Sequence, residues 1–303
     1  MTIAVTGATG FVGQALLDRA VAAGVPVRAL TRREQPARGG VEWVRGELAD
    51  REALARLVSG ADAVLHVAGV VNTPDPMGFH LGNVAGTRGL MDAARAAGCA
   101  RLVFVSSLAA REPQLSRYGG SKREAEDMLR ADGIDWTIVR PPAIYGPRDR
   151  EILELFRAAR WGVVPMPPAG RASIVHVDDL VRLLLILART EGAAVSRLVF
   201  EPDDGRERGW SHRELARAIG AAVGRKVLVP HVPTPLLRAA VRLDRLVRRE
   251  GAKLTDDRVG YMVHPDWVCR PEHAVPPSLW SAGIETSAGL AETARWYRAQ
   301  GWL

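Results

Sequence analysis

The sequence predicts an α/β protein: a doubly wound, Rossmann-type parallel sheet with a small, partly discontinuous C-terminal domain. Short β-rich apolar runs alternate with helical patterns through the first two thirds of the chain. A glycine-rich turn directly follows the first run, at residues 7–13. Strand–helix alternation with short connections indicates a parallel sheet covered on both faces, and right-handed crossovers then give the doubly wound order.

The expected elements follow from these runs in order. Strands are predicted at residues 3–6, 27–30, 41–44, 63–67, 102–106 and 137–139, and helices at 11–23, 51–57, 84–97 and 122–131. Prolines and glycines break the pattern between 141 and 170. Strand and helix then return over 174–187, and 197–200 is predicted to be a further strand. From about residue 202 onward the chain is expected to be rich in loops.

This change in the sequence pattern, from alternating strands and helices to a loop-rich segment, predicts two domains. Residues 1–145, together with about 172–201, are expected to form an NAD(P)-binding Rossmann domain. Residues 146–171 and 202–303 are expected to form the substrate-binding domain, and 202–303 alone contain five of the eight tryptophans.

Composition excludes several classes of protein. The chain has 303 residues, 47% of them hydrophobic and 25% charged, which is close to the globular average. Two cysteines, Cys99 and Cys269, are too few for a disulfide framework and suggest no metal site. The apolar run at 183–188 is far shorter than the roughly 20 residues of a membrane span. No targeting peptide is recognised, so we expect a cytoplasmic protein, a monomer or a homodimer.

The formal net charge of +7 is an ambiguous signal. It could indicate a nucleic-acid partner, but the arginines are spread along the whole chain and only Lys122, Lys226 and Lys253 are lysines. We interpret the positive charge as a general bias of the composition toward arginine, and we expect no nucleic-acid binding.

The glycine turn predicts a dinucleotide site. Gly7 permits the tight turn, Gly10 allows the backbone to approach a pyrophosphate, and Gly13 allows close packing of helix and strand. The helix that begins here presents free N–H groups to phosphate, so Thr9, Phe11 and Val12 join the predicted cofactor contacts.

The end of the second strand bears on the choice of cofactor. An NAD site usually has a carboxylate there for the ribose 2′-hydroxyl, but this chain has Arg32 and Arg33 with no acid before Glu34. A guanidinium pairs with a 2′-phosphate, so we favour NADP, with NAD as the alternative.

A catalytic group is predicted after the fifth strand. Ser106 and Ser107 end that strand, and Tyr118 and Lys122 lie four residues apart on one face of the next helix. An ammonium near a phenol stabilises the phenolate, so Tyr118 is suited to exchange a proton with a carbonyl or alcohol oxygen. Ser107 can hydrogen-bond the same oxygen.

These motifs together resemble those of the extended or atypical short-chain dehydrogenases/reductases of the NAD(P)-dependent epimerase/dehydratase superfamily. The likeness runs almost end to end. It covers the glycine turn, the Asn83-containing helix start, the Ser107 strand end, Tyr118/Lys122, the segments 140–147 and 176–179, and the C-terminal Trp296–Tyr297.

The resemblance implies specific roles for these residues. Tyr118 is the acid/base, Lys122 its electrostatic partner and ribose ligand, Ser107 the donor to the substrate oxygen, and Asn83 a relay or structural member. His176 and Asp178 are structural. The remaining cofactor contacts implied are Glu47, Leu48, Ala68, Gly69, Ser106, Pro141, Ala143 and Ile144.

Three departures argue against a nucleotide-sugar epimerase. Ala143 stands where such enzymes usually have asparagine, Val71 where many have lysine, and the connection from Ser107 to Tyr118 is short. The short connection resembles the branch that includes the NADPH-binding accessory subunit of respiratory complex I. We therefore expect an NADP(H)-preferring oxidoreductase for a small carbonyl or alcohol. The alternatives are an epimerase/dehydratase that retains its cofactor and a non-catalytic NADPH-binding assembly or sensor protein.

One further segment, residues 235–249, is predicted to be an amphipathic helix with a basic stripe. We interpret the stripe as a solvated arginine face of the substrate domain. The alternative is contact with an anionic membrane surface or an acidic partner.

Overall fold

The computed structural model describes residues 1–73, 75, 77–248 and 255–303. Contacts divide the chain into two compact units: residues 1–140 with 180–200, and residues 141–179 with 201–303. The expected strand and helix alternation lies in the first unit.

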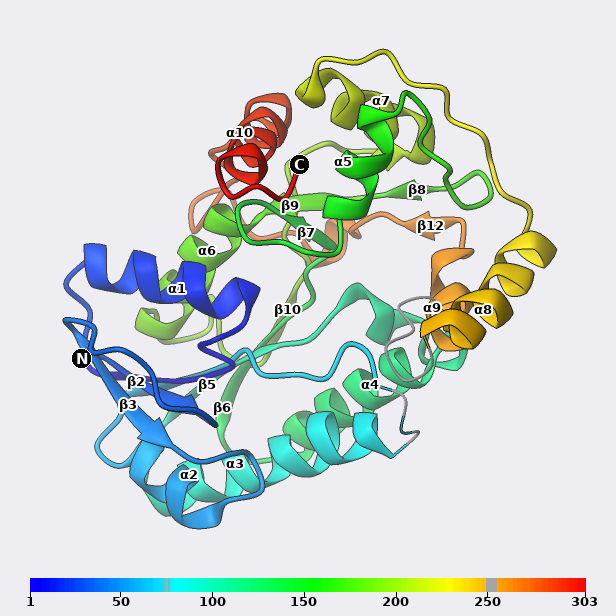
Figure 1. Ribbon diagram of the computed structural model, residues 1–303. Coiled ribbons are helices and arrows are strands. Elements are labelled where there is room, and N and C mark those ends of the chain that lie inside the picture. The colour runs from blue at the N-terminus through cyan, green and yellow to red at the C-terminus, as the bar shows by residue number, and fades with distance from the viewer. Residues whose placement is uncertain (74, 76, 249–254) are drawn as a thin grey trace. The chain divides into compact units, whose positions relative to one another are not determined.

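The first unit contains one seven-stranded parallel sheet of order β10-β6-β5-β4-β1-β2-β3 (Figure 1). Its strands are β1 (Ile3–Thr6), β2 (Val27–Thr31), β3 (Val41–Arg45), β4 (Ala63–His66), β5 (Arg101–Val105), β6 (Asp135–Val139) and β10 (Leu198–Phe200). The strand order reverses between β1 and β4, which is the position where open α/β sheets bind ligands. The Rossmann-type fold is confirmed.

Helices cover both faces of this sheet. Figure 1 shows α2 (Arg51–Val58), α3 (Gly86–Ala96) and α4 (Arg117–Ala131) on one face, with α1 (Phe11–Ala22) and α6 (Val177–Arg189) on the other. Buried Leu54, Leu90, Phe104, Leu129 and Ile138 belong to one apolar cluster between the sheet and the first group of helices. This burial on both sides explains why the strands have continuous apolar runs rather than alternating patterns.

Two helices of the first unit differ from their predicted bounds. The helix expected at 84–97 is preceded by a π-helix, η1 (His80–Ala85), and α4 begins at Arg117 rather than at Lys122. Two 3₁₀ turns, η2 (Leu108–Arg111) and η3 (Pro113–Leu115), fill the short connection before α4.

The second unit contains β7 (Ala143–Tyr145) paired with β9 (Ile174–His176), and a three-stranded sheet of β8 (Arg171–Ala172), β11 (Trp210–Ser211) and β12 (Asp266–Trp267). Its helices are α5 (Leu153–Arg160), α7 (His212–Val223), α8 (Thr234–Arg248), α9 (Asp256–Met262) and α10 (Thr286–Ala299), with a 3₁₀ turn η5 (Pro271–His273). The loop-rich expectation beyond residue 202 is therefore wrong. The sequence carried a signal for α7, since Ser211 and Glu214 form a capping box at its start.

Among the described residues, no helix has the length and apolar character needed to cross a membrane.

Candidate active site

The glycine turn joins β1 to α1 and approaches the end of β4. Gly7 has φ +73°, and a Cβ there would lie 2.6 Å from the Ala68 backbone nitrogen. At Gly13 a Cβ would lie 2.1 Å from the Gly7 carbonyl oxygen. Both positions therefore require glycine for the fold itself, because a side chain would displace backbone.

Gly10 is different, because the protein leaves space beside it. It is the N-cap of α1, and a Cβ there would come no closer than 3.3 Å to the Gly7 carbonyl oxygen. No side chain caps this helix, and no acidic residue lies in its first turn. The helix start at Phe11 and Val12 thus offers N–H groups and a positive dipole end to an anion.

A buried hydrogen-bond chain holds β1, β4 and α3 together below this turn. The Thr6 hydroxyl lies 2.6 Å from Nδ1 of His66, whose Nε2 lies 2.8 Å from the Thr87 hydroxyl. Thr87 donates to the Asn83 carbonyl (2.6 Å), so it accepts from His66 Nε2–H, and Nδ1 accepts from Thr6. Burial, with the Lys122 cation nearby, lowers the pKa of His66 to about 3. His66 is therefore a neutral core residue.

Asn83 connects the loop after β4 to the first turn of α4. Its Oδ1 accepts from the Val70 amide (2.6 Å), and its Nδ2 donates to the Val70 carbonyl and to Ser121 Oγ, both at 2.9 Å. Ser121 in turn donates to the Tyr118 carbonyl (2.8 Å). One amide hydrogen of Asn83 therefore supports the turn of α4 that carries Tyr118, and the other holds the loop after β4.

Lys122 extends from α4 to the ends of two strands. Its Nζ donates to the Val105 carbonyl (2.9 Å) and lies 4.9 Å from the centre of the Phe104 ring. A Cβ on Gly69 would lie 2.9 Å from this Nζ. Burial lowers the pKa of Lys122 to about 8, although Glu126 acts in the opposite direction.

Ser107 and Tyr118 lie on neighbouring segments. Ser107 is the N-cap of η2, where its Oγ accepts from the Ala109 amide (3.2 Å). A Cβ on Gly119 would lie 2.5 Å from the Ala109 carbonyl oxygen, so the first turn of α4 packs directly against η2. Tyr118 is half-buried, and its ring centre lies 6.2 Å from that of Phe79.

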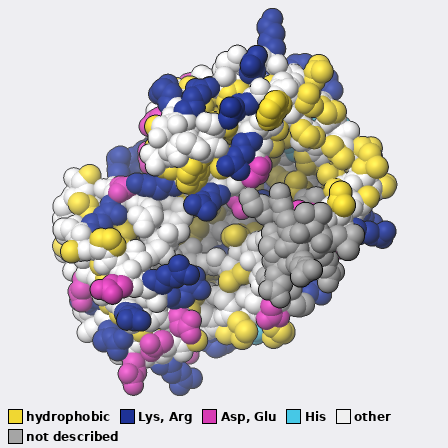
Figure 2. Space-filling model, viewed as in Figure 1, with side chains coloured by type: hydrophobic (Ala, Val, Ile, Leu, Met, Phe, Trp, Pro, Cys, Tyr) yellow, Lys and Arg dark blue, Asp and Glu magenta, His cyan; other side chains and the backbone are white. Residues whose placement is uncertain are grey.

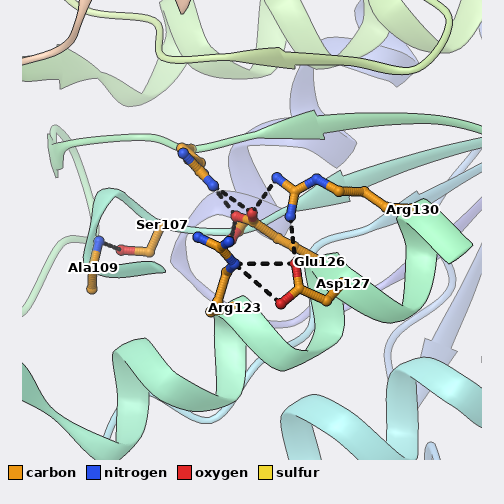
Figure 3. A network of polar contacts seen from close by, with 8 residues as sticks. Ser107, Ala109, Arg123, Glu126, Asp127 and Arg130 are labelled. Atoms are coloured by element: carbon orange, nitrogen blue, oxygen red, sulfur yellow. Dashed lines mark hydrogen bonds and ion pairs between the residues drawn. The ribbon is translucent and has the colours of Figure 1, made fainter. Parts of the chain in front are cut away.

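Figure 3 shows Glu126 and Arg130 in a network of polar contacts, and Ser106 belongs to the same network. The Ser106 hydroxyl donates to Glu126 Oε1 (2.6 Å). The Glu126 carboxylate is fully buried and also accepts two hydrogen bonds from Arg140, at 2.8 and 2.6 Å, and one from Arg130 at 2.8 Å. This cluster fixes β5, β6 and α4 relative to one another. Sequence reasoning missed it, because Arg140 was noted only as part of a motif.

The remaining predicted cofactor residues of the first unit follow β2 and β3. Arg32 and Arg33 follow β2 and are exposed, and within the described part of the chain neither guanidinium has an ion pair or hydrogen bond. Leu48 is half-buried and packs beside Gly86, whereas Glu47 is exposed.

Pro141, Ala143 and Ile144 belong to the second unit, so their role in cofactor binding stays a prediction. In that unit His176 is buried and accepts the Asp178 amide at its Nδ1 (3.2 Å). The next residue, Asp179, accepts the amides of Gly283 and Ile284, both at 2.9 Å.

Comparison with known proteins identifies the family. Residues 7–154 match the NAD(P)H-binding family. A ceramide reductase of Caulobacter vibrioides is 38% identical over 99% of this chain and 96% of its own length. The chain belongs to the NAD(P)H-binding family that includes this ceramide reductase.

Two further comparisons concern a second reductase relative and the fold. A 2-alkyl-3-oxoalkanoate reductase of Stenotrophomonas maltophilia is 32% identical over 74% of this chain and 76% of its own. A UDP-glucose 4-epimerase of Thermotoga maritima has the same fold, with a TM-score of 0.74 and 21% identity over 99% of both chains. The reductase relatives and the NAD(P)H-binding match support an NAD(P)-dependent oxidoreductase.

The residues present fit the superfamily's nicotinamide dinucleotide. The uncapped start of α1 and the space beside Gly10 suit a pyrophosphate. The absence of a side chain at Gly69 allows the Lys122 ammonium to approach the end of β4, and an ammonium there can donate to a ribose hydroxyl.

Replacement of glycine by alanine is expected to have different effects at Gly10 and at Gly13. Gly10→Ala is expected to leave the melting temperature near that of the wild type and to weaken NAD(P)H binding by about 10-fold or more, because the methyl group occupies the path of the pyrophosphate. Gly13→Ala is expected to cost about 1–3 kcal/mol of stability through overpacking. Thermal melts and cofactor fluorescence titrations measure both. Equal cofactor affinity in Gly10→Ala and wild type would contradict the site.

Lys122 is expected to titrate abnormally in the cofactor-free protein. Because burial lowers its pKa from the ordinary 10.5 to about 8, its ammonium charge is present below about pH 8 and is lost above it. The chain has three lysines, so ¹⁵Nζ-lysine NMR gives a spectrum in which Lys122→Arg assigns the resonance. If the resonance removed by this substitution titrated above pH 10, the buried position of Lys122 would be wrong.

Proposed function

We propose that this protein is an NADPH-preferring ketoreductase that converts a carbonyl group on an alkyl chain into an alcohol, with Tyr118 as the proton donor. The observation that carries the proposal is the placement of Lys122 and the Tyr118 turn at the carboxyl ends of β4 and β5, next to the glycine turn. When bound, the reduced nicotinamide supplies the hydride.

The chain's own residues account for the proton and for the position of the substrate oxygen. The Lys122 ammonium lies in a low-dielectric environment, where it stabilises a nearby phenolate more strongly than in water. Tyr118 can then release its proton to the substrate oxygen. Ser107 uses its oxygen as an acceptor for Ala109, which leaves its hydroxyl proton available to the same substrate oxygen.

The substrate class is supported by exposed apolar side chains between β4 and Asn83. Val71, Met77 and Leu81 are 59%, 55% and 58% exposed, and they lie on the segment that leads from the end of β4 to Asn83. Exposed apolar side chains on this segment suit an alkyl chain better than a nucleotide sugar. The names of the two reductase relatives, a ceramide reductase and a 2-alkyl-3-oxoalkanoate reductase, agree with a substrate of this class.

The preference for NADPH rests on Arg32 and Arg33. Other arginines of this region, such as Arg28 and Arg38, pair with Glu42 and Asp18, whereas the guanidinium groups of Arg32 and Arg33 make no such pair within the described residues. Two unpaired guanidinium groups at the end of β2 can bind a 2′-phosphate.

Removing the charges of Arg32 and Arg33 is expected to weaken the binding of NADPH much more than that of NADH. Arg32→Ala combined with Arg33→Ala should weaken NADPH binding by about 10–100-fold, because charge-assisted hydrogen bonds to the 2′-phosphate are lost. NADH binding should change by less than about 3-fold. Arg19→Ala, at an exposed arginine on α1, is the control. Fluorescence titration with both cofactors is the measurement, and an equal loss for NADH and NADPH would contradict the preference.

A further inference from the structure

The second unit exposes several large apolar side chains that its own core does not use. Trp161 is 88% exposed, Leu228 73%, Leu243 63% and Leu236 61%. Single exposed apolar residues are ordinary on protein surfaces, but a group of them marks an interaction site. These four side chains mark such a site only if the segments that carry them are connected.

Trp161 and Leu228 lie on two segments that pair directly. Trp161 directly follows α5. The Leu228 amide donates to the Gly162 carbonyl (2.8 Å), and Val163 pairs with Leu228 in an isolated parallel β-bridge. Val163 is itself 42% exposed. The two chain segments thus form one short apolar ridge.

This ridge continues into α8. Met166 pairs with His231 in a second isolated β-bridge, and the Val232 amide donates to the Met166 carbonyl (2.8 Å). Val232 lies two residues before the start of α8 at Thr234. In Figure 2, hydrophobic side chains gather along this edge of the second unit, over the segment that leads into α8 and over α8 itself.

One exposed face of α8 is apolar from residue 236 to residue 243. Leu236, Ala240 and Leu243 follow the i, i+4, i+7 spacing of one helix face, and all three are exposed. Val241, on another face, is only 5% exposed. The helix therefore anchors itself through Val241 and presents leucines to the surroundings.

Cations flank this surface and lack acidic partners. The exposed basic residues on the same segments are Arg160, Arg225, Lys226, Arg238 and Arg242. None of the five side chains has an ion pair or hydrogen bond within residues 1–73, 75, 77–248 and 255–303. The sequence has no Asp or Glu in 160–168 or 224–243. Arg249, the end of the predicted basic stripe, lies outside the described residues.

From these observations we infer that the second unit binds the surface of an anionic lipid bilayer through Trp161, Leu228, Leu236 and Leu243, with the five cations on the lipid headgroups. Tryptophan and leucine partition into the headgroup–acyl boundary, and nearby Lys and Arg attract anionic lipids. A second copy of this chain is a poorer occupant, because the same five cations would then face one another. The inference rests on the surface of the second unit and does not require the proposed activity, although a lipid-like substrate would be found in the same bilayer.

Co-sedimentation of the full chain with vesicles tests this inference. One set of vesicles contains phosphatidylcholine only, and the other contains equal parts of phosphatidylcholine and phosphatidylglycerol. We expect binding to the anionic vesicles that weakens with salt. Trp161→Ser with Leu228→Ser, and separately Arg238→Gln with Arg242→Gln, should each reduce the partition coefficient by about 10-fold or more.

Matched controls separate this surface from general apolarity and charge. Val21→Ser on α1 and Arg213→Gln with Arg295→Gln change exposed residues elsewhere and should leave binding unchanged. The inference is overturned if the wild type does not sediment with anionic vesicles, or if the surface variants bind as the wild type does. It is also overturned if the arginine variant loses binding while Trp161→Ser with Leu228→Ser binds as the wild type does, because the association would then be purely electrostatic. Size-exclusion chromatography that shows a dimer abolished by Trp161→Ser with Leu228→Ser would likewise assign the surface to self-association.

Discussion

Turnover falls by about 10²–10⁴-fold when Tyr118 is replaced by phenylalanine, while NADPH affinity stays within about 3-fold of the wild type. The reason is that phenylalanine keeps the half-buried ring beside Phe79 but has no proton to give to the substrate oxygen. Initial rates with a 3-oxoalkanoate and NADPH, together with a fluorescence titration of the cofactor, provide the two numbers.

Ser107→Ala is the matched control for this loss. It removes a hydrogen bond to the same substrate oxygen but leaves the acid in place, so its rate should fall less than that of Tyr118→Phe. If Tyr118→Phe retained near wild-type turnover, a group other than Tyr118 would have to supply the proton, and the proposed chemistry would fail.

The second large effect concerns stability. Glu126→Ala is expected to lower the free energy of unfolding by about 3–5 kcal/mol. Arg140, which is 6% exposed, would lose its ion pair with this carboxylate, and breaking a buried ion pair by removing one partner is strongly destabilising. Ser106 would lose its acceptor as well. Urea denaturation followed by circular dichroism measures the change.

Asp127→Ala is the neighbouring control. Asp127 is exposed and pairs with Arg123 and Arg130 on the surface of α4, so its loss should cost less than about 1 kcal/mol. A Glu126→Ala variant as stable as Asp127→Ala would show that the buried cluster contributes little to the fold.

The sequence predicted those parts of the fold that depend on local patterns. The strands β1 to β6 and β10, the glycine turn and the Tyr118/Lys122 spacing each follow from runs of a few residues. The reversal of strand order between β1 and β4 follows from the doubly wound topology, which the alternation of strands and helices requires.

The parts that escaped prediction depend on contacts between residues far apart in the chain. Glu126 and Arg140 are separated by 14 residues and meet only because α4 packs beside β6. The Asn83–Ser121 bond joins residues 38 apart, and the π-helix that carries Asn83 has no reliable sequence signature. In contrast, the capping box of α7 was a local signal that could have been found.

The central claim is that this chain moves a hydride between NADPH and a carbonyl carbon. The most direct measurement is a turnover with NADPH deuterated at the transferable position and a 3-oxoalkanoate substrate, followed by mass spectrometry of the product. The claim predicts deuterium on the new carbinol carbon and one NADP⁺ formed for each alcohol. An isomerised or dehydrated product with no net oxidation of the cofactor would contradict it, and so would the absence of turnover across carbonyl substrates that bind.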